Sequence, residues 1–348
     1  MELGVNLVYQ GAATLARAAE ELGYAVALAP EGYRSDAPSV LGYVAGRTER
    51  IGLASGVMQI PGRPPAMAAL TAATLHALSG GRFRLGLGVS NPDVADGWYG
   101  AAADHPLART REYVAIVRAA LRGGPVRYAG RYFPLPARGS TEAPLHLFTD
   151  PLPVDLPIYL GAVGPANLRL AGEVGDGWIG VFASPEMVAE AVADIAEGRR
   201  RAGYGMDGFE VMPCLAAAVA DEPERAADLV RGQYVYLLGI GHPEQNVYCR
   251  LVGRLGFGDA VAEVRSRLSS GDRAGAAAAV PLELIDATAL VGPVDRLADR
   301  LDRYADAGVT TLGVMVSAAA TDLDGRLAIL HAVAEAHHRC GAKRSAGV

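Results

Sequence analysis

The chain has 348 residues, of which 51% are hydrophobic and 20% charged, and its formal net charge is −6. This composition supports a large buried core and excludes an intrinsically disordered chain. The acidic balance disfavours nucleic acid and anionic membranes as partners, because both bind basic patches. No apolar run reaches the roughly 18 residues of a membrane span, and MELGVNLVYQ has no basic segment before its hydrophobic residues. We therefore expect a cytoplasmic protein.

Short apolar runs alternate with amphipathic stretches along the chain, a pattern typical of βα units and a parallel sheet. We predict strands at 3–8, 24–29, 51–58, 82–89, 157–162, 178–182, 209–219 and 311–316. We predict helices at 11–22, 65–78, 107–121, 165–174, 185–201 and 295–307. Several of these helices begin near a proline and end at a glycine. Eight alternations without a long polar linker favour a (β/α)8 TIM barrel, with residues 1–348 as one domain, over a doubly wound sheet.

Two stretches interrupt the alternation. Residues 126–136 predict a small hairpin that turns at Ala129-Gly130. Residues 239–292 carry helical patterns but no clear strand, which predicts a helical insertion before the last βα unit. Insertions of this kind often form lids over the mouth of a barrel, and we expect this one to act as a lid.

The cysteines and histidines predict no metal site. Cys214, Cys249 and Cys340 are odd in number and widely separated, which is typical of a reducing compartment and gives no disulfide framework. The segment HHRC at 337–340 lies in a polar tail after the last helical pattern. We interpret it as a solvated helix end and not as a set of metal ligands.

Glycines and a strand-to-helix turn mark the expected mouth of the barrel, at the carboxyl ends of the strands. Gly86 and Gly88 either allow the close approach of a ligand or relieve crowding inside the barrel. In GAVGPANL, Val163 and Gly164 precede a helix, so their N–H groups and those of the first turn could hold a phosphate. Alternatively, this sequence forms only a tight turn with proline at the first helical position.

Together these segments resemble the bacterial luciferase-like flavin monooxygenase superfamily. The resemblance rests on SGVMQIPGRPPAMAALTAATLHALSGGRFRLGLGVS, on GWYG, PLARTREYVAIVRAAL and SPE, and on LPIYLGAVGPANLRLAGEVGDGW. It covers most of the chain, from Leu3 to about Val316, and within the superfamily the sequence is most similar to the reductases that use the deazaflavin coenzyme F420. The resemblance implies a (β/α)8 barrel with the cofactor ring at its mouth, and a homodimer.

The resemblance also implies a set of cofactor-binding residues. In such proteins a non-prolyl cis peptide at the end of the third strand backs the ring, and Gly56-Val57 stands at the matching place. The edge of the fourth strand lies beside the ring, and a turn after the fifth strand binds the phosphate. The residues at the matching positions are Gly56, Val57, Met58, Gly88, Ser90, Asn91, Ala162, Val163 and Gly164.

The second strand of these enzymes commonly ends in a polar residue that faces the reactive carbon, and Glu31 holds that position here. A carboxylic acid could give the substrate a proton if burial raised its pKa, and Asp36 and Asp93 are further catalytic candidates. The structural alternatives are that Glu31 pairs with Arg34 in solvent and that Asp36 caps a helix. Arg63, Arg138 or Arg169 could meet the glutamyl tail of coenzyme F420, or could simply be solvated.

Three functions follow from the resemblance. The first is a reductase in which reduced coenzyme F420 gives a hydride to an electron-poor C=C, C=N or C=O of a small molecule. The second is a monooxygenase that uses reduced FMN and oxygen, and the third is a binding protein that has lost its cofactor. The closeness of MQIPGRPPAM and GVSNPDVADGWYG to the deazaflavin branch favours the first. The sequence does not name the substrate.

Overall fold

The computed structural model describes residues 1–32, 35–149, 156–320 and 322–346. The chain divides into two compact units. The first unit comprises Met1–Leu28, Gly180–Val192 and Val211–Val348, and the second comprises Ala29–Ile179 and Ala193–Glu210. We describe each unit separately.

The second unit is built on parallel strands that helices connect. Its strands are β3 (Gly52–Ser55), β4 (Met58–Gln59), β5 (Phe83–Gly88), β6 (Ile158–Gly161) and β7 (Gly177–Val181), and β5 pairs with β3, β4 and β6. Its helices include α2 (Ala37–Ala45), α3 (Pro65–Leu78), α4 (Pro92–Gly97), α5 (Pro106–Leu121) and α6 (Pro165–Val174). Helix α3 packs against both α2 and α5. Most of the buried residues of α3 are alanines, whose small side chains allow a close approach.

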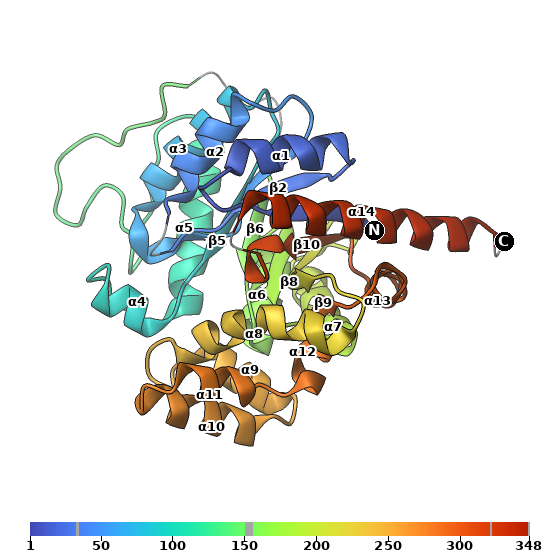
Figure 1. The fold of residues 1–348 in the computed structure, drawn as a ribbon. Helices are drawn as coiled ribbons and strands as arrows, with labels where there is room; N and C mark the ends of the chain where they lie inside the picture. The colour runs from blue at the N-terminus through green and yellow to red at the C-terminus, as the bar shows by residue number, and fades with distance from the viewer. Residues whose placement is uncertain (33–34, 150–155, 321, 347–348) are drawn as a thin grey trace. The chain divides into compact units, whose positions relative to one another are not determined.

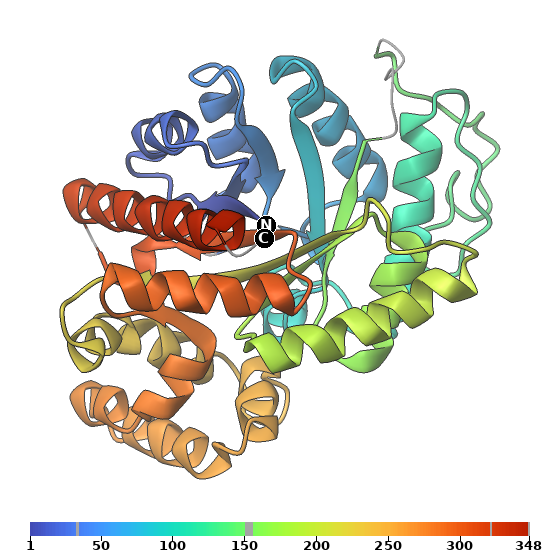
Figure 2. The ribbon, with the colours of Figure 1, turned by 90° about the vertical axis from the view of Figure 1, so that its right-hand side faces the viewer.

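The first unit combines strands with a group of helices. Its strands β1 (Glu2–Asn6), β2 (Val26–Ala29), β8 (Glu210–Ala218), β9 (Ala289–Val291) and β10 (Thr311–Met315) are parallel, and β10 pairs with both β1 and β8. Helices α9 (Val247–Arg254), α10 (Gly258–Ser269) and α11 (Arg273–Ala278) pack with α8 (Pro223–Gly239) (Figure 1). Helix α13 (Val294–Asp306) lies beside α14 (Leu323–Ala346) (Figure 2). Its remaining helices are α1 (Ala12–Glu21) and α12 (Leu282–Thr288). Helix α7 (Pro185–Arg201) and the strands β2, β7 and β8 have residues in both units.

The strand order is that of a closed barrel. It runs β10-β1-β2-β3-β5-β6-β7-β8, and a further pairing of β10 with β8 closes the ring. Strand β4 pairs with β5 outside this ring, and β9 pairs with β8. Each predicted strand is present, although most ends differ by one to three residues. The predicted (β/α)8 TIM barrel is therefore confirmed.

Three local predictions differ from the structure. Strand β9 lies inside the stretch predicted to lack a strand, and 337–340 belong to the long helix α14 and not to a tail. The hairpin at 126–136 is a single antiparallel bridge between Tyr128 and Leu135, so the predicted turn at Ala129-Gly130 is wrong. Helices α9 to α12 occupy most of the predicted insertion, and its action as a lid stays a prediction.

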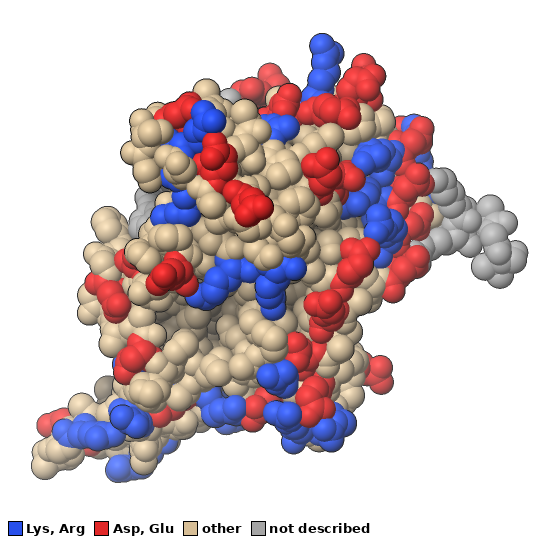
Figure 3. All heavy atoms as spheres, turned by 90° about the horizontal axis from the view of Figure 1, so that it is seen from below, with Lys and Arg blue, Asp and Glu red and all other residues tan. Residues whose placement is uncertain are grey.

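Two features of the described residues bear on the partners of the protein. No helix in the described part of the chain has both the length and the apolar composition that crossing a membrane requires. On the face drawn in Figure 3, basic and acidic side chains are interspersed. Several charged side chains of the described residues form exposed ion pairs, for example Arg111 with Glu173 and Arg267 with Asp272.

Candidate active site

The connection between β3 and β4 contains the predicted cis peptide. The bond between Gly56 and Val57 is cis although neither residue is proline, which confirms the expectation drawn from the resemblance. We call the segment Gly56-Val57 the cis edge. The Gly56 N–H donates to the carbonyl oxygen of Ala29 at 2.8 Å, and this hydrogen bond connects the cis edge to the end of β2. Gly56 and Val57 are half-buried, whereas Met58 is fully buried.

Gly86 and Gly88 allow β5 to approach this edge closely. A Cβ atom on Gly86 would lie 1.9 Å from the carbonyl oxygen of Ser55, and one on Gly88 would lie 2.5 Å from Cγ2 of Val57. The hydroxyl of Ser55 donates to the Gly86 carbonyl oxygen at 2.8 Å and accepts from the Gly86 N–H at 2.9 Å. These two glycines therefore relieve crowding, and the binding of a cofactor beside Gly88 stays a prediction.

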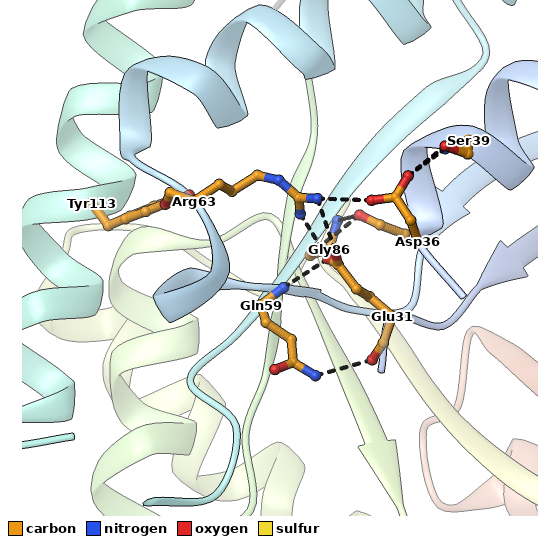
Figure 4. A network of polar contacts seen from close by, with 8 residues as sticks. Glu31, Asp36, Ser39, Gln59, Arg63, Gly86 and Tyr113 are labelled. Atoms are coloured by element: carbon orange, nitrogen blue, oxygen red, sulfur yellow. Dashed lines mark hydrogen bonds and ion pairs between the residues drawn. The ribbon is translucent and has the colours of Figure 1, made fainter. Parts of the chain in front are cut away.

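Glu31 and Arg63 form a buried ion pair beside the same edge (Figure 4). The two guanidinium nitrogens of Arg63 donate to the two carboxylate oxygens of Glu31 at 2.7 and 2.8 Å. The Gln59 main-chain N–H donates to Oε2 of Glu31 at 3.1 Å. The side chains are only 7% exposed for Glu31 and 15% for Arg63, so solvent screens the pair little.

The contacts of this pair favour the charged form of Arg63. Burial opposes the charge of Arg63, but the hydrogen bonds and the charge of Glu31 outweigh it and raise the pKa of the guanidinium. Three N–H groups donate to the two carboxylate oxygens of Glu31. The prediction that Glu31 is solvated is wrong, because its side chain is buried; its expected partner Arg34 lies outside the described residues.

Asp36 has the structural role that we considered for it. Its carboxylate accepts from the Ser39 N–H at 2.9 Å and from the Ser39 hydroxyl at 2.7 Å, which confirms that it caps α2. Arg63 also donates to Asp36 at 3.1 Å, so Glu31 and Asp36 share one guanidinium (Figure 4). The Asp36 side chain is 49% exposed, and this second ion pair is correspondingly weaker.

Gln59 belongs to the same network, and the sequence did not predict this. Its Nε2 donates to the main-chain oxygen of Glu31 at 3.1 Å. Its side chain is buried, and Oε1 has no hydrogen-bond partner among the residues that the structure describes. The only signal in the sequence was a polar residue within an apolar strand.

The end of β5 carries the next group of predicted residues. Ser90 has a φ of 63°, in the left-handed region that few residues other than glycine adopt. Asn91 is buried, and α4 begins directly after it. Asp93 lies exposed in the first turn of α4, on a different element from Glu31 and Asp36.

The turn from β6 into α6 has an open geometry. Gly164 is the N-cap residue of α6, and no side chain from the described residues caps this helix. A Cβ atom on Gly164 would meet no atom of the described chain within 4 Å. Val163 and Gly164 are half-buried and Ala162 is buried, with its carbonyl oxygen accepting from Nε1 of Trp178 at 2.8 Å. An anion could therefore reach the free N–H groups at the start of this helix.

The remaining predicted residues lie in other contacts. Arg169 pairs with Asp194, whereas Arg138 donates to the main-chain oxygens of Gly130 and Arg131. No group of three or more His, Cys, Asp or Glu side chains in the described ranges could hold a metal ion. His337 contacts the Met1 carbonyl oxygen through Nε2, and Cys340 donates to Asp302, so both contribute to packing of α14.

The fold is a closed parallel (β/α)8 TIM barrel. The family model for luciferase-like monooxygenases matches residues 3–311 of the chain. The protein therefore belongs to the luciferase-like monooxygenase family.

Relatives of this chain include proteins named for coenzyme F420. A Mycobacterium tuberculosis protein named "putative coenzyme F420-dependent oxidoreductase Rv3520c" is 38% identical over 335 residues, which cover 92% of this chain and 96% of the relative. The 5,10-methylenetetrahydromethanopterin reductase of Archaeoglobus fulgidus is 31% identical, with 78% of this chain and 79% of the relative covered. The structure of the coenzyme F420-dependent tetrahydromethanopterin reductase of Methanopyrus kandleri superposes with a TM-score of 0.80 at 22% identity, covering 96% of this chain and 97% of that chain.

Proposed function

We propose that the protein is a coenzyme F420-dependent oxidoreductase that reduces an electron-poor C=C, C=N or C=O of a small molecule. The names of its relatives support the cofactor, since one of them is 38% identical over nearly the whole chain. The observation that carries the proposal in the structure is the open start of α6, which lies two strands away from the Gly56-Val57 edge.

The spacing of these two features fits a ring cofactor with a single phosphate. Strand β5 pairs with β4 on one side and with β6 on the other. Because neighbouring strands lie about 4.8 Å apart, β4 and β6 are separated by roughly 10 Å. A tricyclic ring against Val57 and a ribityl chain beside β5 could bridge this separation. The phosphate would then meet the main-chain N–H groups of Val163 and Gly164.

The residues of the chain would bind and orient the reactants. When bound, reduced coenzyme F420 supplies the hydride. Val57 would support one face of the ring, and Ser90 and Asn91 would lie along its edge. The pair of Glu31 and Arg63 holds the main chain of Gln59 in place, so it fixes the edge on which the ring would rest.

Proton donation by Glu31 stays a prediction, and its contacts favour a positioning role. Three N–H groups already donate to its carboxylate, and its side chain bridges Arg63 and the main chain of Gln59. Asp93, which is exposed in the first turn of α4, remains a further candidate for the proton donor.

A binding titration tests the proposed cofactor. We expect coenzyme F420 to bind the purified protein saturably, with a change in deazaflavin fluorescence, and FMN to bind more weakly. Tight binding of FMN without a response to F420 would contradict the proposal and favour the monooxygenase. Binding of neither compound would favour a protein that has lost its cofactor.

Glu31→Gln tests the role of the buried pair. We expect the substitution to lower turnover of an activated alkene or imine by about tenfold or more, and to lower turnover more than cofactor affinity. A positioning role leaves the shape of the pH profile of kcat unchanged, whereas a proton-donor role removes one of its limbs. Glu173→Gln, in the exposed pair with Arg111, is the matched control and should change neither quantity. Unchanged turnover in Glu31→Gln would exclude this residue from the mechanism.

A further inference from the structure

Oε1 of Gln59, in the second unit, is a buried hydrogen-bond acceptor that lacks a partner among the described residues. Gln59 is 9% exposed, and its Oε1 has no hydrogen-bond partner among the described residues. Its other polar atoms are used, because Nε2 donates to the Glu31 main-chain oxygen and the main-chain N–H donates to Oε2 of Glu31 (Figure 4). Buried polar atoms in native proteins are nearly always paired, so this oxygen requires an explanation.

The orientation of the Gln59 amide is determined by its neighbour. The atom that faces the Glu31 carbonyl oxygen must be a donor, and Nε2 is the only donor of the side chain. Exchanging the two amide atoms would place one acceptor against another. Oε1 is therefore the atom left without a partner, and its partner must be a group that donates an N–H or an O–H.

The position of Gln59 indicates which molecule supplies that donor. Gln59 follows the cis edge by two residues and pairs in register with Gly88 on β5. Both neighbours are residues against which the ring would lie under the proposed function. The buried acceptor thus belongs to the same edge of the sheet as the expected ring.

We propose that Oε1 of Gln59 accepts a hydrogen bond from the imide N–H of the pyrimidinedione portion of the cofactor ring. This inference rests on the proposed function. The imide is a fixed N–H donor between two carbonyl groups, and Gln59 is held rigidly by Glu31. Gln59 is then a specificity-determining residue, which selects a ring that carries this donor and sets the rotation of the ring on the Gly56-Val57 edge.

Methylation of the imide nitrogen gives a direct test. Dissociation constants are measured by fluorescence for coenzyme F420 and for its imide N-methyl derivative, with the wild-type protein and with Gln59→Met. We expect methylation to weaken binding to the wild type about tenfold or more, as the loss of one buried hydrogen bond should. Gln59→Met should weaken binding of F420 to a similar extent, and methylation should then have little further effect.

Controls separate this inference from its alternatives. Gln245→Met removes an exposed glutamine of the first unit and should change neither dissociation constant. Should Gln59→Met fail to fold, the two ligands compared on the wild type still decide. Equal binding of both ligands by the wild type, or full discrimination by Gln59→Met, would overturn the inference while leaving the proposed function intact. If the wild type binds neither ligand, the proposed function fails and the inference fails with it.

Discussion

Gly86 and Gly164 lack a side chain for opposite reasons. At Gly86 a Cβ atom would lie 1.9 Å from a main-chain oxygen, which cannot move without shifting β3. At Gly164 the same atom would meet nothing within 4 Å among the described residues. Gly164 also has φ −87° and ψ 155°, which any residue adopts readily. Packing therefore requires the first glycine, whereas no described atom requires the second.

Gly164→Val tests this difference. We expect the free energy of unfolding to change by less than about 0.5 kcal/mol, because the position is open and unstrained. The affinity for coenzyme F420 should fall about tenfold, since the new methyl groups would crowd the phosphate. Gly205→Val is the matched control, as Gly205 is also open and lies in a loop of the same unit, and it should leave affinity unchanged. Wild-type affinity in Gly164→Val would exclude this turn as the phosphate site.

The sequence predicted local contacts of the candidate residues better than it predicted contacts between distant residues. The cap formed by Asp36 is local, three residues from Ser39, so the pattern of letters was sufficient. Glu31 and Arg63 are 32 residues apart and meet only because β3 and β4 bring them together. Gln59 joins them through the same strands, so its role could be found only in the structure.

At the level of elements, the carboxylate of Glu112 fixes the main chain of residues 131–133, in the segment after α5. Glu112 on α5 accepts from the main-chain N–H groups of Arg131, Tyr132 and Phe133 at 2.8, 2.9 and 3.0 Å. These N–H groups are therefore not available for a hairpin ladder, which explains why the prediction of a tight hairpin was wrong. Partial burial opposes ionisation of Glu112, but these hydrogen bonds outweigh it and lower the pKa of the carboxyl.

The lowered pKa predicts how pH affects this contact. Because the carboxyl binds protons less readily in the folded state, its contribution is fully present above the ordinary glutamate pKa of about 4.3. The contribution is lost as the pH falls through the lower folded-state pKa. We expect Glu112→Gln to destabilise the protein by about 1 kcal/mol at pH 7, and the difference from wild type to shrink below about pH 4. Urea unfolding at both pH values measures this, with the exposed Glu142→Gln as control; an equal difference at both would contradict the account.

Two predictions of secondary structure were wrong, one at a very short strand and one at the polar end of a long helix. Strand β9 has only three residues, too few for a periodic pattern. Helix α14 does carry a helical pattern, since Leu330, Val333 and Ala334 are buried at helical spacing. This spacing of buried residues predicts that the helix continues through 337–340. The prediction of a tail from the polar residues HHRC was therefore wrong.

At the level of the whole molecule, the alternation of strands and helices was sufficient to predict the barrel. Buried parallel strands read as apolar runs, and helices that cover a parallel sheet have their own period, so each βα unit is visible locally. The closure of the ring through β10 and β8 follows from the number of units and needs no further signal. The choice of cofactor and substrate depends instead on a few side chains, and no period in the sequence reports them.

A crystal structure of the protein with coenzyme F420 would show where the ring and the phosphate bind. We expect the ring against the Gly56-Val57 edge, and the phosphate within hydrogen-bond distance of the main-chain N–H groups of Val163 and Gly164. A ring bound away from β4, or a phosphate held by other residues while the start of α6 stays open to solvent, would contradict this expectation.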